Sequence, residues 1–430
     1  MRFFKWLYPG LRVKRWLLVS FLGIIFIGFG GAVASGHWIL MRIELGMQGA
    51  IFNLTGLDSP ALGGALFLVL GIVLTTFGLR QVFRSLMGSL LPGADGDLVD
   101  VLYQHRFLKN GPQIVVLGGG TGLSVLLRGL KEYTSNLTAI VTVTDDGGSS
   151  GRLRSELGVL PPGDIRNCLV ALADKETLMD EVLGYRFKQG QGLAGHSLGN
   201  LLLVATSEMA GGFVQSIQEV SKILAVRGQV LPATLSQEAL CAELLDGQIV
   251  EGETEITKRG GEGISRVFLR PGNPRPVDES LMAIEKAEAI ILGPGSLYTS
   301  IIPNLLVEGV TEALRKARGI KIYICNVMTQ PGETDHFTAS DHLRVIYEHC
   351  GDELIDYIIV NAQEAKESKL QKYEYKGAYP VRIDQRDLAG LGVKVVREDL
   401  LDQSDMVRHD PHRLAGAVLK LVMRKRLIKE

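Results

Sequence analysis

The sequence predicts an α/β domain with a mainly parallel sheet and helices on both faces, preceded by an N-terminal transmembrane helical hairpin. From residue 114 onward, short all-apolar runs alternate with segments of helical periodicity, which is typical of a parallel sheet buried on both faces. Ahead of them, two uncharged apolar stretches are each long enough to span a bilayer. The chain therefore divides into a membrane anchor (1–90), a juxtamembrane linker (91–111) and a large domain (112–430).

The membrane prediction depends on the stretches Trp16–Ala34 and Ala61–Leu79. At about 1.5 Å per residue, a helix of this length crosses most of a ~30 Å hydrocarbon layer. Five basic residues precede the first stretch, and Arg80 and Arg84 follow the second. The connection between the stretches contains one Lys or Arg, Arg42, together with Glu44 and Asp58. The positive-inside rule then places both ends of the hairpin in the cytoplasm, with the hairpin in the inner (cytoplasmic) membrane.

Two other interpretations of these stretches stay open. Ala32–Ala34 imitates the small-residue site at which a signal peptide is cleaved. The apolar core is longer than the roughly 7–15 residues of a signal peptide, however, and the second stretch would still hold the chain at the membrane. A buried helical hairpin in a soluble protein is the other interpretation. Pro92–Gly96 interrupts the amphipathic segment that follows, which indicates a juxtamembrane helix and a linker.

The composition excludes several classes of protein. Lys and Arg total 46 against 47 Asp and Glu, and no long basic run occurs in the second half, so we expect no nucleic acid partner. The four cysteines, Cys168, Cys241, Cys325 and Cys350, are far apart in the sequence. None forms the close pair of a zinc knuckle or redox motif, so they are expected to be reduced cytosolic thiols.

A glycine-rich turn follows the first predicted strand of the domain. The apolar run Ile114–Leu117 ends in it, and the amphipathic segment Leu123–Lys131 continues it as a helix. Glycine permits positive φ and close approach, and backbone N–H groups at a helix start attract anions, so the turn predicts phosphate binding. Leu123 stands where the dinucleotide fingerprint needs glycine, which argues against NAD. The candidate residues are Gly118, Gly119, Gly120, Thr121 and Gly122.

A second polar loop follows the predicted strand Ala139–Val143. Asp145 and Asp146 can accept hydrogen bonds from ribose hydroxyls or hold a divalent ion. The Gly/Ser run after them contains Ser149 and leads to Arg152, which can close over phosphate. An exposed polar loop without a ligand is the alternative.

Two shorter motifs follow. Asp164 is a plausible N-cap of the helix that begins after Pro161-Pro162, which leaves Arg166 and Asn167 as possible ligand contacts. The segment 195–199 has the G-x-S-x-G pattern of hydrolases, but no strand precedes it, so Ser197 is interpreted as an N-cap. The side chains of His196 and Asn200 are then directed at the ligand or at neighbouring loops.

Two more loops are expected at the same edge of the sheet. The first follows the apolar run Ala289–Leu292 and faces the first glycine turn across a crevice. The other begins at Asn326, after Lys321–Cys325. The acidic and histidine residues at 335–336 and 341–342 lack metal-ligand spacing, and two helix starts explain them. The further candidate ligand residues are Gly293, Gly295, Ser296, Tyr298 and Asn326.

Six motifs, in order along the chain, closely resemble those of the YvcK-like proteins, which are gluconeogenesis factors related to the 2-phospho-L-lactate transferase of coenzyme F420 synthesis. They are Gly-Gly-Gly-Thr-Gly-Leu-Ser at 118–124, Thr-Asp-Asp-Gly-Gly-Ser-Ser-Gly-Arg at 144–152, Pro-Pro-Gly-Asp-Ile-Arg-Asn at 161–167, Gly-His-Ser-Leu-Gly-Asn at 195–200, Gly-Pro-Gly-Ser-Leu-Tyr-Thr-Ser at 293–300 and Asn-Val-Met-Thr-Gln-Pro-Gly-Glu-Thr at 326–334. The resemblance extends from about Pro112 to the C-terminus.

This resemblance implies a Rossmann-like fold that binds UDP-N-acetylglucosamine and acts in bacterial cell-shape and cell-wall control, without an established reaction. Both glycine loops, Asp145, Asp146 and Asn200 match the ligand crevice of the family. Tyr373 and Arg408 fall where the family has a Tyr and an Arg associated with sugar-nucleotide binding, so Tyr373 could stack on uracil and Arg408 could pair with diphosphate. The hairpin is a departure, since the better-known members begin close to the glycine turn.

Three functions follow as hypotheses. The leading one is a non-catalytic sensor at the membrane, in which the sugar nucleotide changes contacts with cell-wall or regulatory proteins. The alternative is a transferase that uses a divalent ion such as Mg²⁺ near Asp145 and Asp146 to move a phosphoryl-containing group. A scaffold with a vestigial crevice is the third. We also expect a homo-oligomer.

Overall fold

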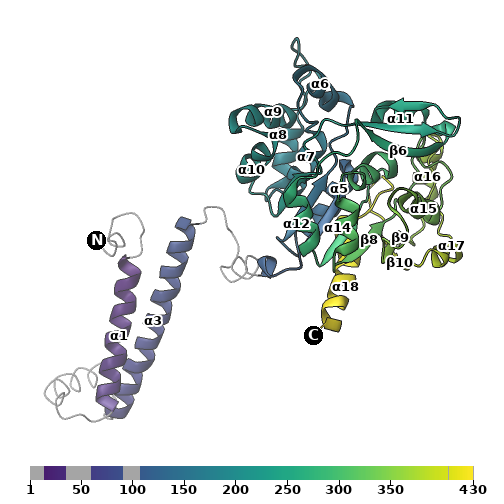
Figure 1. Cartoon of the computed structure of the whole chain (residues 1–430). Coiled ribbons are helices and arrows are strands. Elements are labelled where there is room, and N and C mark those ends of the chain that lie inside the picture. The colour runs from purple at the N-terminus through teal and green to yellow at the C-terminus, as the bar shows by residue number, and fades with distance from the viewer. Residues whose placement is uncertain (1–13, 35–59, 91–106, 405, 430) are drawn as a thin grey trace. The chain divides into compact units, whose positions relative to one another are not determined.

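The computed structural model describes residues 14–34, 60–90, 107–404 and 406–429, in two compact units, Met1–His105 and Arg106–Glu430 (Figure 1). The first unit pairs two long helices, α1 (Lys14–Ala34) and α3 (Pro60–Leu90). Both predicted apolar stretches lie in them, and α3 runs on through the predicted juxtamembrane helix to Leu90. The rest of the predicted linker up to residue 106 lies outside the described residues.

Small residues and aromatic rings hold the two helices together. A Cβ on Gly23 would lie 2.6 Å from the backbone nitrogen of Thr75, so the backbones approach closely. Phe26 and Phe67 stack with ring centroids 5.6 Å apart. Outward-facing side chains are apolar as well, and Phe21 is 61% exposed. The segments Arg15–Ala32 and Gly64–Ser85 are long and apolar enough to cross a membrane, by length and composition alone.

The second unit is built on a seven-stranded parallel sheet with the order β10-β9-β8-β7-β1-β2-β3. This architecture confirms the predicted parallel α/β fold. The predicted second strand is shifted, because the sheet ends at Val141 and residues 142–143 already belong to the loop. The strands are β1 (Ile114–Gly118), β2 (Leu137–Val141), β3 (Gln229–Pro232), β7 (Ala289–Leu292), β8 (Ile320–Ile324), β9 (Tyr357–Asn361) and β10 (Lys394–Glu398).

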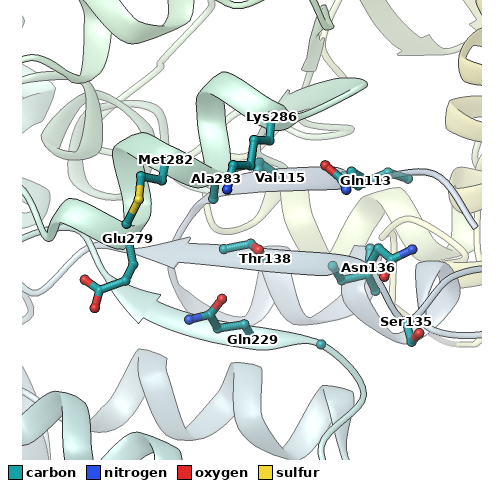
Figure 2. Close-up of a pocket in the computed structure, with 13 residues that line it drawn as sticks. Gln113, Val115, Ser135, Asn136, Thr138, Gln229, Glu279, Met282, Ala283 and Lys286 are labelled. Carbon is teal, nitrogen blue, oxygen red and sulfur yellow. The ribbon is translucent and has the colours of Figure 1, made fainter. Parts of the chain in front are cut away.

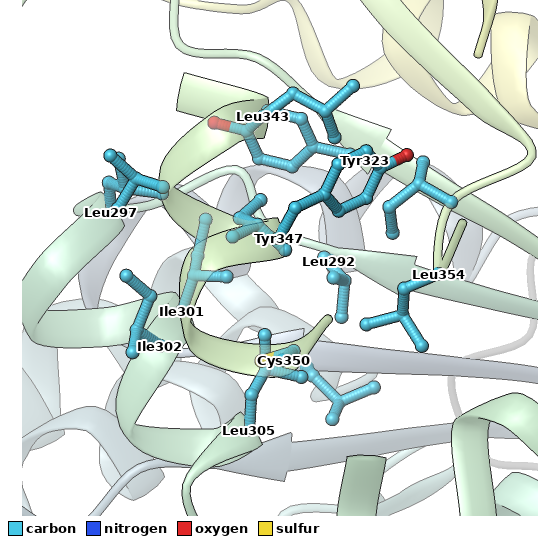
Figure 3. Close-up of a cluster of buried hydrophobic side chains, with 14 of the residues drawn as sticks. Leu292, Leu297, Ile301, Ile302, Leu305, Tyr323, Leu343, Tyr347, Cys350 and Leu354 are labelled. Carbon is cyan, nitrogen blue, oxygen red and sulfur yellow. The ribbon is translucent and has the colours of Figure 1, made fainter. Parts of the chain in front are cut away.

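Helices cover both faces of this sheet, and alternate strand residues enter two separate cores. Ile114 and Val116 pack with α5, α7, α10 and α18, whereas Val115 and Leu117 pack with α12, α14 and α15. Figure 3 shows the second core, where Leu343 and Tyr347 of α15 meet the strands. These helices are α5 (Gly120–Leu130), α7 (Gly163–Leu172), α10 (Phe213–Ile223), α12 (Asp278–Lys286), α14 (Val310–Lys316), α15 (Ala339–Cys350) and α18 (Pro411–Lys429).

A small antiparallel sheet, which the sequence patterns did not reveal, is inserted between β3 and β7. It has the order β5-β4-β6, and its helix α11 (Glu253–Arg259) follows β5. The strands are β4 (Ala239–Leu244), β5 (Ile249–Glu251) and β6 (Ile264–Arg270). The remaining helices are α6 (Gly148–Leu157), α8 (Glu176–Gly184), α9 (Leu198–Ala210), α13 (Ile302–Leu305), α16 (Glu367–Glu374) and α17 (Gln385–Gly390), with a π-helical turn at Leu297–Ile301.

Candidate functional site

A crevice opens at the carboxyl end of the sheet, at the point where the strand order reverses. The chain proceeds from β1 to β2 and β3 on one side, and β7 lies against the other side of β1. In open parallel sheets, ligands bind at such switch points. A cavity of about 330 Å³ lies there, bounded by the loops after β1, β7 and β8 and by the segment before α18. Of the predicted ligand residues, it is lined by Gly119, Gly120, Thr121, Gly122, Gly295, Ser296, Asn326 and Arg408.

Glycine is required at two positions of the first loop for close approach. A Cβ on Gly119 would lie 2.6 Å from a carboxylate oxygen of Asp164, and one on Gly122 would lie 2.6 Å from the carbonyl oxygen of Pro294. Gly120, with a φ of 64°, begins α5. The N-cap residue Gly119 has no side chain to cap the helix, so the N–H groups of the first turn beyond Gly120, and the positive end of the helix dipole, are offered to an anion.

The loop after β7 is held in place by the loop after β8. The side-chain amide of Asn326 exchanges two hydrogen bonds with the backbone of Gly295, at 3.3 and 2.8 Å. Ser296 donates to Gln330 at 2.8 Å and also contacts the Glu333 carboxylate. Tyr298 lies outside the crevice, because its ring is buried in the apolar core, and burial raises the pKa of its hydroxyl.

The two aspartates of the loop after β2 have different partners. Asp145 accepts a hydrogen bond from the backbone N–H of Gly147 at 2.8 Å. Asp146 accepts two from Thr254, from the backbone at 3.0 Å and from the hydroxyl at 2.8 Å. Thr254 is in the first turn of α11, so Asp146 satisfies the amino-terminal end of that helix. Asp146 thus connects the loop after β2 to α11 and the small antiparallel sheet.

Asp164 has a different role from the predicted one. The N-cap of α7 is Pro162, and no side chain makes a capping bond there. The Asp164 carboxylate instead accepts a hydrogen bond from the backbone of Gly120, in the first glycine loop. Burial, and then the charge of Asp145, raises the pKa of Asp164 from 3.8 to about 6. The prediction of a cap on its own helix was therefore wrong, and Asp164 belongs to the site.

Asp145 and Asp164 are part of a cluster of four carboxyl groups next to the glycine loop. The other two are Glu253 of α11 and Glu333 of the loop after β8. Burial, and then the charges of the other three groups, raises the pKa of Glu253 from 4.5 to about 9. Burial also raises the pKa of Glu333. At neutral pH this cluster is expected to hold a proton on Glu253.

The cluster does not fit a metal site as it stands. In the described part of the chain, no three side chains of His, Cys, Asp or Glu converge closely enough to hold an ion. Asp145 and Asp146, the predicted Mg²⁺ ligands, are turned toward Gly147 and α11. The acidic and histidine residues at 335–342 have structural partners too. Asp341 completes the capping box of α15, which confirms one of the two predicted helix starts. The other prediction was wrong, because residues 335–336 lie in a turn, where Asp335 accepts a hydrogen bond from the backbone N–H of Gly332 at 2.8 Å.

Five predicted candidates form one hydrogen-bonded network with each other. Ser149 bonds to Nδ1 of His196 at 3.0 Å and accepts from Asn200 at 3.1 Å. Arg166 donates to Asn200 at 3.0 Å and to Asn167 at 2.6 Å. Burial and then the charge of Arg152 lower the pKa of His196, which favours the neutral imidazole. The network joins the first turn of α6 to α7 and to the start of α9 (Leu198–Ala210).

Ser197 is confirmed as an N-cap. Its hydroxyl accepts from the backbone of Asn200 at 3.3 Å, and it also accepts from Arg166 at 2.6 Å. With 0% exposure, it is not a nucleophile presented to a substrate. Arg152 lies nearby and donates to the backbone carbonyl of Ala194 at 2.9 Å.

The segment before α18 forms a wall of the crevice. Arg408 lines the cavity, with Nε 2.9 Å from Oδ2 of Asp402 and its side chain 47% exposed. The hydroxyl of Tyr373 accepts from the backbone N–H of Val407 at 3.1 Å, which fixes this segment. His409, which the sequence patterns did not single out, also lines the cavity, and burial lowers its pKa to about 4.

A larger cavity of about 450 Å³ lies at the opposite, amino-terminal edge of the sheet (Figure 2). It is lined by Gln113 and Asn136, which directly precede β1 and β2, by Gln229 of β3, and by Glu279 and Lys286 of α12. The two glycine loops and the start of α5 do not line it, because they lie at the carboxyl edge. The switch-point crevice is therefore the candidate site.

A Rossmann-like sheet with an anion-binding crevice at its switch point defines the general class of this protein. Comparison with known proteins is more specific, because residues 114–401 match the family model described as 2-phospho-L-lactate transferase CofD. The chain belongs to this family, within the branch of the gluconeogenesis factors.

Relatives of two lengths match the chain. The gluconeogenesis factor of Bacillus subtilis is 50% identical and covers 72% of this chain and 98% of its own. A crystal structure of a UPF0052 family protein from Bacillus halodurans, 50% identical, superposes with a TM-score of 0.69 over 72% of this chain and 99% of its own. A homologue from Nostoc sp. is 48% identical over 97% of this chain, which necessarily includes most of residues 1–105. The second unit thus exists as a separate protein in some relatives.

Proposed function

We propose that this protein is a membrane-anchored regulatory protein whose domain, on the cytosolic side, binds UDP-N-acetylglucosamine in the switch-point crevice. The observation that carries the proposal is the pair of glycine loops facing each other across that cavity, with the amino-terminal end of α5 on one wall. In this role it would act in cell-shape and cell-wall control and in growth on gluconeogenic carbon sources, through cell-wall or regulatory proteins and as a homo-oligomer.

The chemistry of the cavity suits a nucleoside diphosphate. The N–H groups at the start of α5 can receive the diphosphate, and the exposed side of Arg408 can pair with it. Asn326 and Ser296 offer neutral polar groups for a sugar or base. The cavity, at about 330 Å³, lies within the range of roughly 300–1,000 Å³ found for ligand pockets.

Membrane anchoring is the second part of the proposal. It is supported by the lengths and apolar surfaces of α1 and α3 and by the excess of basic residues at both ends of the hairpin. The match to the Nostoc homologue extends over this segment, whereas the Bacillus subtilis protein lacks it. Membrane fractionation of the full chain tests this part: extraction by alkaline carbonate instead of detergent would refute it.

A transferase is the second candidate, and the carboxyl cluster beside the glycine loop favours it. The family model is named after an enzyme that transfers a phospholactate group. Such an activity would need a divalent ion near Asp145 and Asp146, which this arrangement does not supply with three ligands. Mg²⁺-dependent turnover of a nucleotide diphosphate donor would establish it, and full activity of Asp146→Asn would exclude that role for the aspartate.

Calorimetry on the 107–430 domain tests the binding proposal. We expect heat on titration with UDP-N-acetylglucosamine and a roughly tenfold or greater loss of affinity in Arg408→Ala, because a charge-assisted bond to phosphate is lost. Arg382→Ala is a matched control, since this arginine is outside the crevice cavity. An absence of heat with any UDP-sugar at millimolar concentration would end the proposal.

A further inference from the structure

The carboxyl-terminal end of α18 lies at the amino edge of the sheet, opposite the crevice. Lys425 donates to the backbone carbonyl of Arg318 at 2.6 Å, directly before β8. Arg426 makes two bonds to Glu288, at 2.5 and 2.6 Å, directly before β7. Glu288 also accepts from the backbone of Gln113, just before β1, at 3.0 Å. These bonds fix the helix end beside the starts of three strands, and Figure 1 shows it projecting from the domain.

The chain enters the domain at this same edge. A helical turn at residues 107–109 comes directly before β1. Its carbonyls accept from the residues that precede β2: Leu108 from the backbone of Ser135 at 2.9 Å, and Lys109 from the side chain of Asn136 at 2.9 Å. Phe107 is 53% exposed here. Residues 107–109, at which the described part of the domain begins, and the end of α18 therefore share one edge of the domain.

The last turns of α18 have the composition of a helix that lies on a lipid surface. Between residues 420 and 429 there are five basic residues and no acidic one; Lys420 and Arg426 pair with Glu398 and Glu288 of the domain, and the other three add positive charge to this edge. Met423 and Leu427 lie four residues apart, on one face of the helix, and are 46% and 73% exposed. Arg424 is exposed beside them. Exposed apolar residues flanked by cations are the pattern by which helices bind anionic membranes.

We propose that this basic edge, formed by the end of α18 (residues 420–429) and the turn at 107–109, is a contact surface for an anionic phospholipid bilayer. The inference rests on the proposed membrane anchoring, because the tether keeps the lipid headgroups at a high effective concentration. Each basic residue at an anionic surface contributes attraction, and the exposed leucine and methionine can enter the headgroup layer. The consequence is an orientation that leaves the crevice, at the opposite edge, open to the cytosol.

Vesicle flotation with the 107–430 domain tests the surface separately from the hairpin. The domain can be used alone, because relatives such as the Bacillus subtilis protein consist of it. We expect it to float with vesicles of phosphatidylcholine mixed with phosphatidylglycerol, to remain unbound with phosphatidylcholine alone, and to be released by salt. Binding to both kinds of vesicle, or to neither, would overturn the proposal.

Two variants and a control locate the contact. Arg424→Glu and Leu427→Ser should each weaken binding to the mixed vesicles, the first by roughly tenfold or more, since a charge is reversed. Lys258→Glu makes the same charge change on α11, at the opposite edge, and should bind like the wild type. Circular dichroism confirms the folding of each variant. Equal binding by all variants would refute the surface, whereas loss of the full chain from membranes would refute the anchor instead.

Discussion

Replacing Glu253 by glutamine should remove a pH dependence of stability. Glutamine keeps the shape of the carboxylic acid and cannot ionise. The pKa of Glu253 is raised in the folded chain, from 4.5 to about 9, so the folded state binds a proton that the unfolded state has lost. The stabilising contribution of this proton is complete below pH 4.5 and falls as the pH rises toward about 9.

The magnitude follows from proton linkage. One additional proton bound in the folded state lowers the free energy of unfolding by about 1.4 kcal/mol per pH unit across the window. Between pH 4.5 and pH 7 the loss accumulates to about 3.4 kcal/mol. Asp164 has a similar but lower window, because its pKa rises only from 3.8 to about 6. Above about pH 6.5, the pH dependence of the free energy of unfolding therefore reports on Glu253 and no longer on Asp164.

Urea unfolding of the 107–430 domain at several pH values between about 6.5 and 8.5 measures this slope. The wild type should lose stability relative to Glu253→Gln by about 1.4 kcal/mol for each pH unit. Glu255→Gln removes a carboxyl group of the same helix that is 52% exposed beside Lys258. The free energy of unfolding of this variant should therefore change with pH in parallel with that of the wild type. Parallel lines for the wild type and Glu253→Gln would show that Glu253 does not hold the proton, and the reasoning on the cluster would be refuted.

Three further predictions concern the walls of the crevice. Gly122→Ala should abolish UDP-sugar binding in calorimetry, because its Cβ would lie 2.6 Å from a backbone oxygen of the facing loop; Gly184→Ala, where nothing lies within 4 Å, should bind normally. Tyr373→Phe leaves the backbone N–H of Val407 without its acceptor, so it should lower the free energy of unfolding by about 1 kcal/mol and weaken binding of the UDP-sugar. An unchanged affinity would show that Tyr373 does not position the wall of the crevice. Ser197→Ala removes the N-cap of α9 and should lower the free energy of unfolding, measured with urea, by about 1 kcal/mol, while ligand binding stays complete. If the wild type hydrolysed esters and this variant did not, Ser197 would be a nucleophile and the prediction would be contradicted.

The parallel sheet could be predicted because its central strands leave a strong local signal. Buried on both faces, β1 and β7 are continuous apolar runs that lead into glycines, and β8 is apolar except for Lys321 and leads into a polar loop. The edge strands gave no such signal, since β3 has only two apolar residues between Gln229 and Pro232 and β10 contains three charged residues. The antiparallel strand β4 was missed for another reason: its Glu243 interrupts an apolar run that alternation alone does not separate from a helix.

The parts of the site that consist of neighbouring residues in one loop could be predicted from the sequence. The parts that bring together residues far apart in the chain could not. Each glycine loop is one continuous stretch of sequence, and the structure brings the two loops together at the switch point, as their positions at strand ends implied. The carboxyl cluster draws on positions 145, 164, 253 and 333, which no local spacing connects. Glu253 could not be found from the sequence, because the position of α11 depends on a sheet that was not foreseen.

The position of α11 also explains how four carboxyl groups can remain close together. Asp146 accepts two bonds from the first turn of this helix, and Glu333 accepts from Thr257 at 3.1 Å on its next turn. The helix therefore joins the loops after β2 and β8, which lie on opposite sides of the switch point. These three bonds hold Glu253 near the other carboxyl groups, and protonation lowers the repulsion that results. Any ligand that separates these two loops has to strain α11 or break its bonds, so the small antiparallel sheet is mechanically coupled to the crevice.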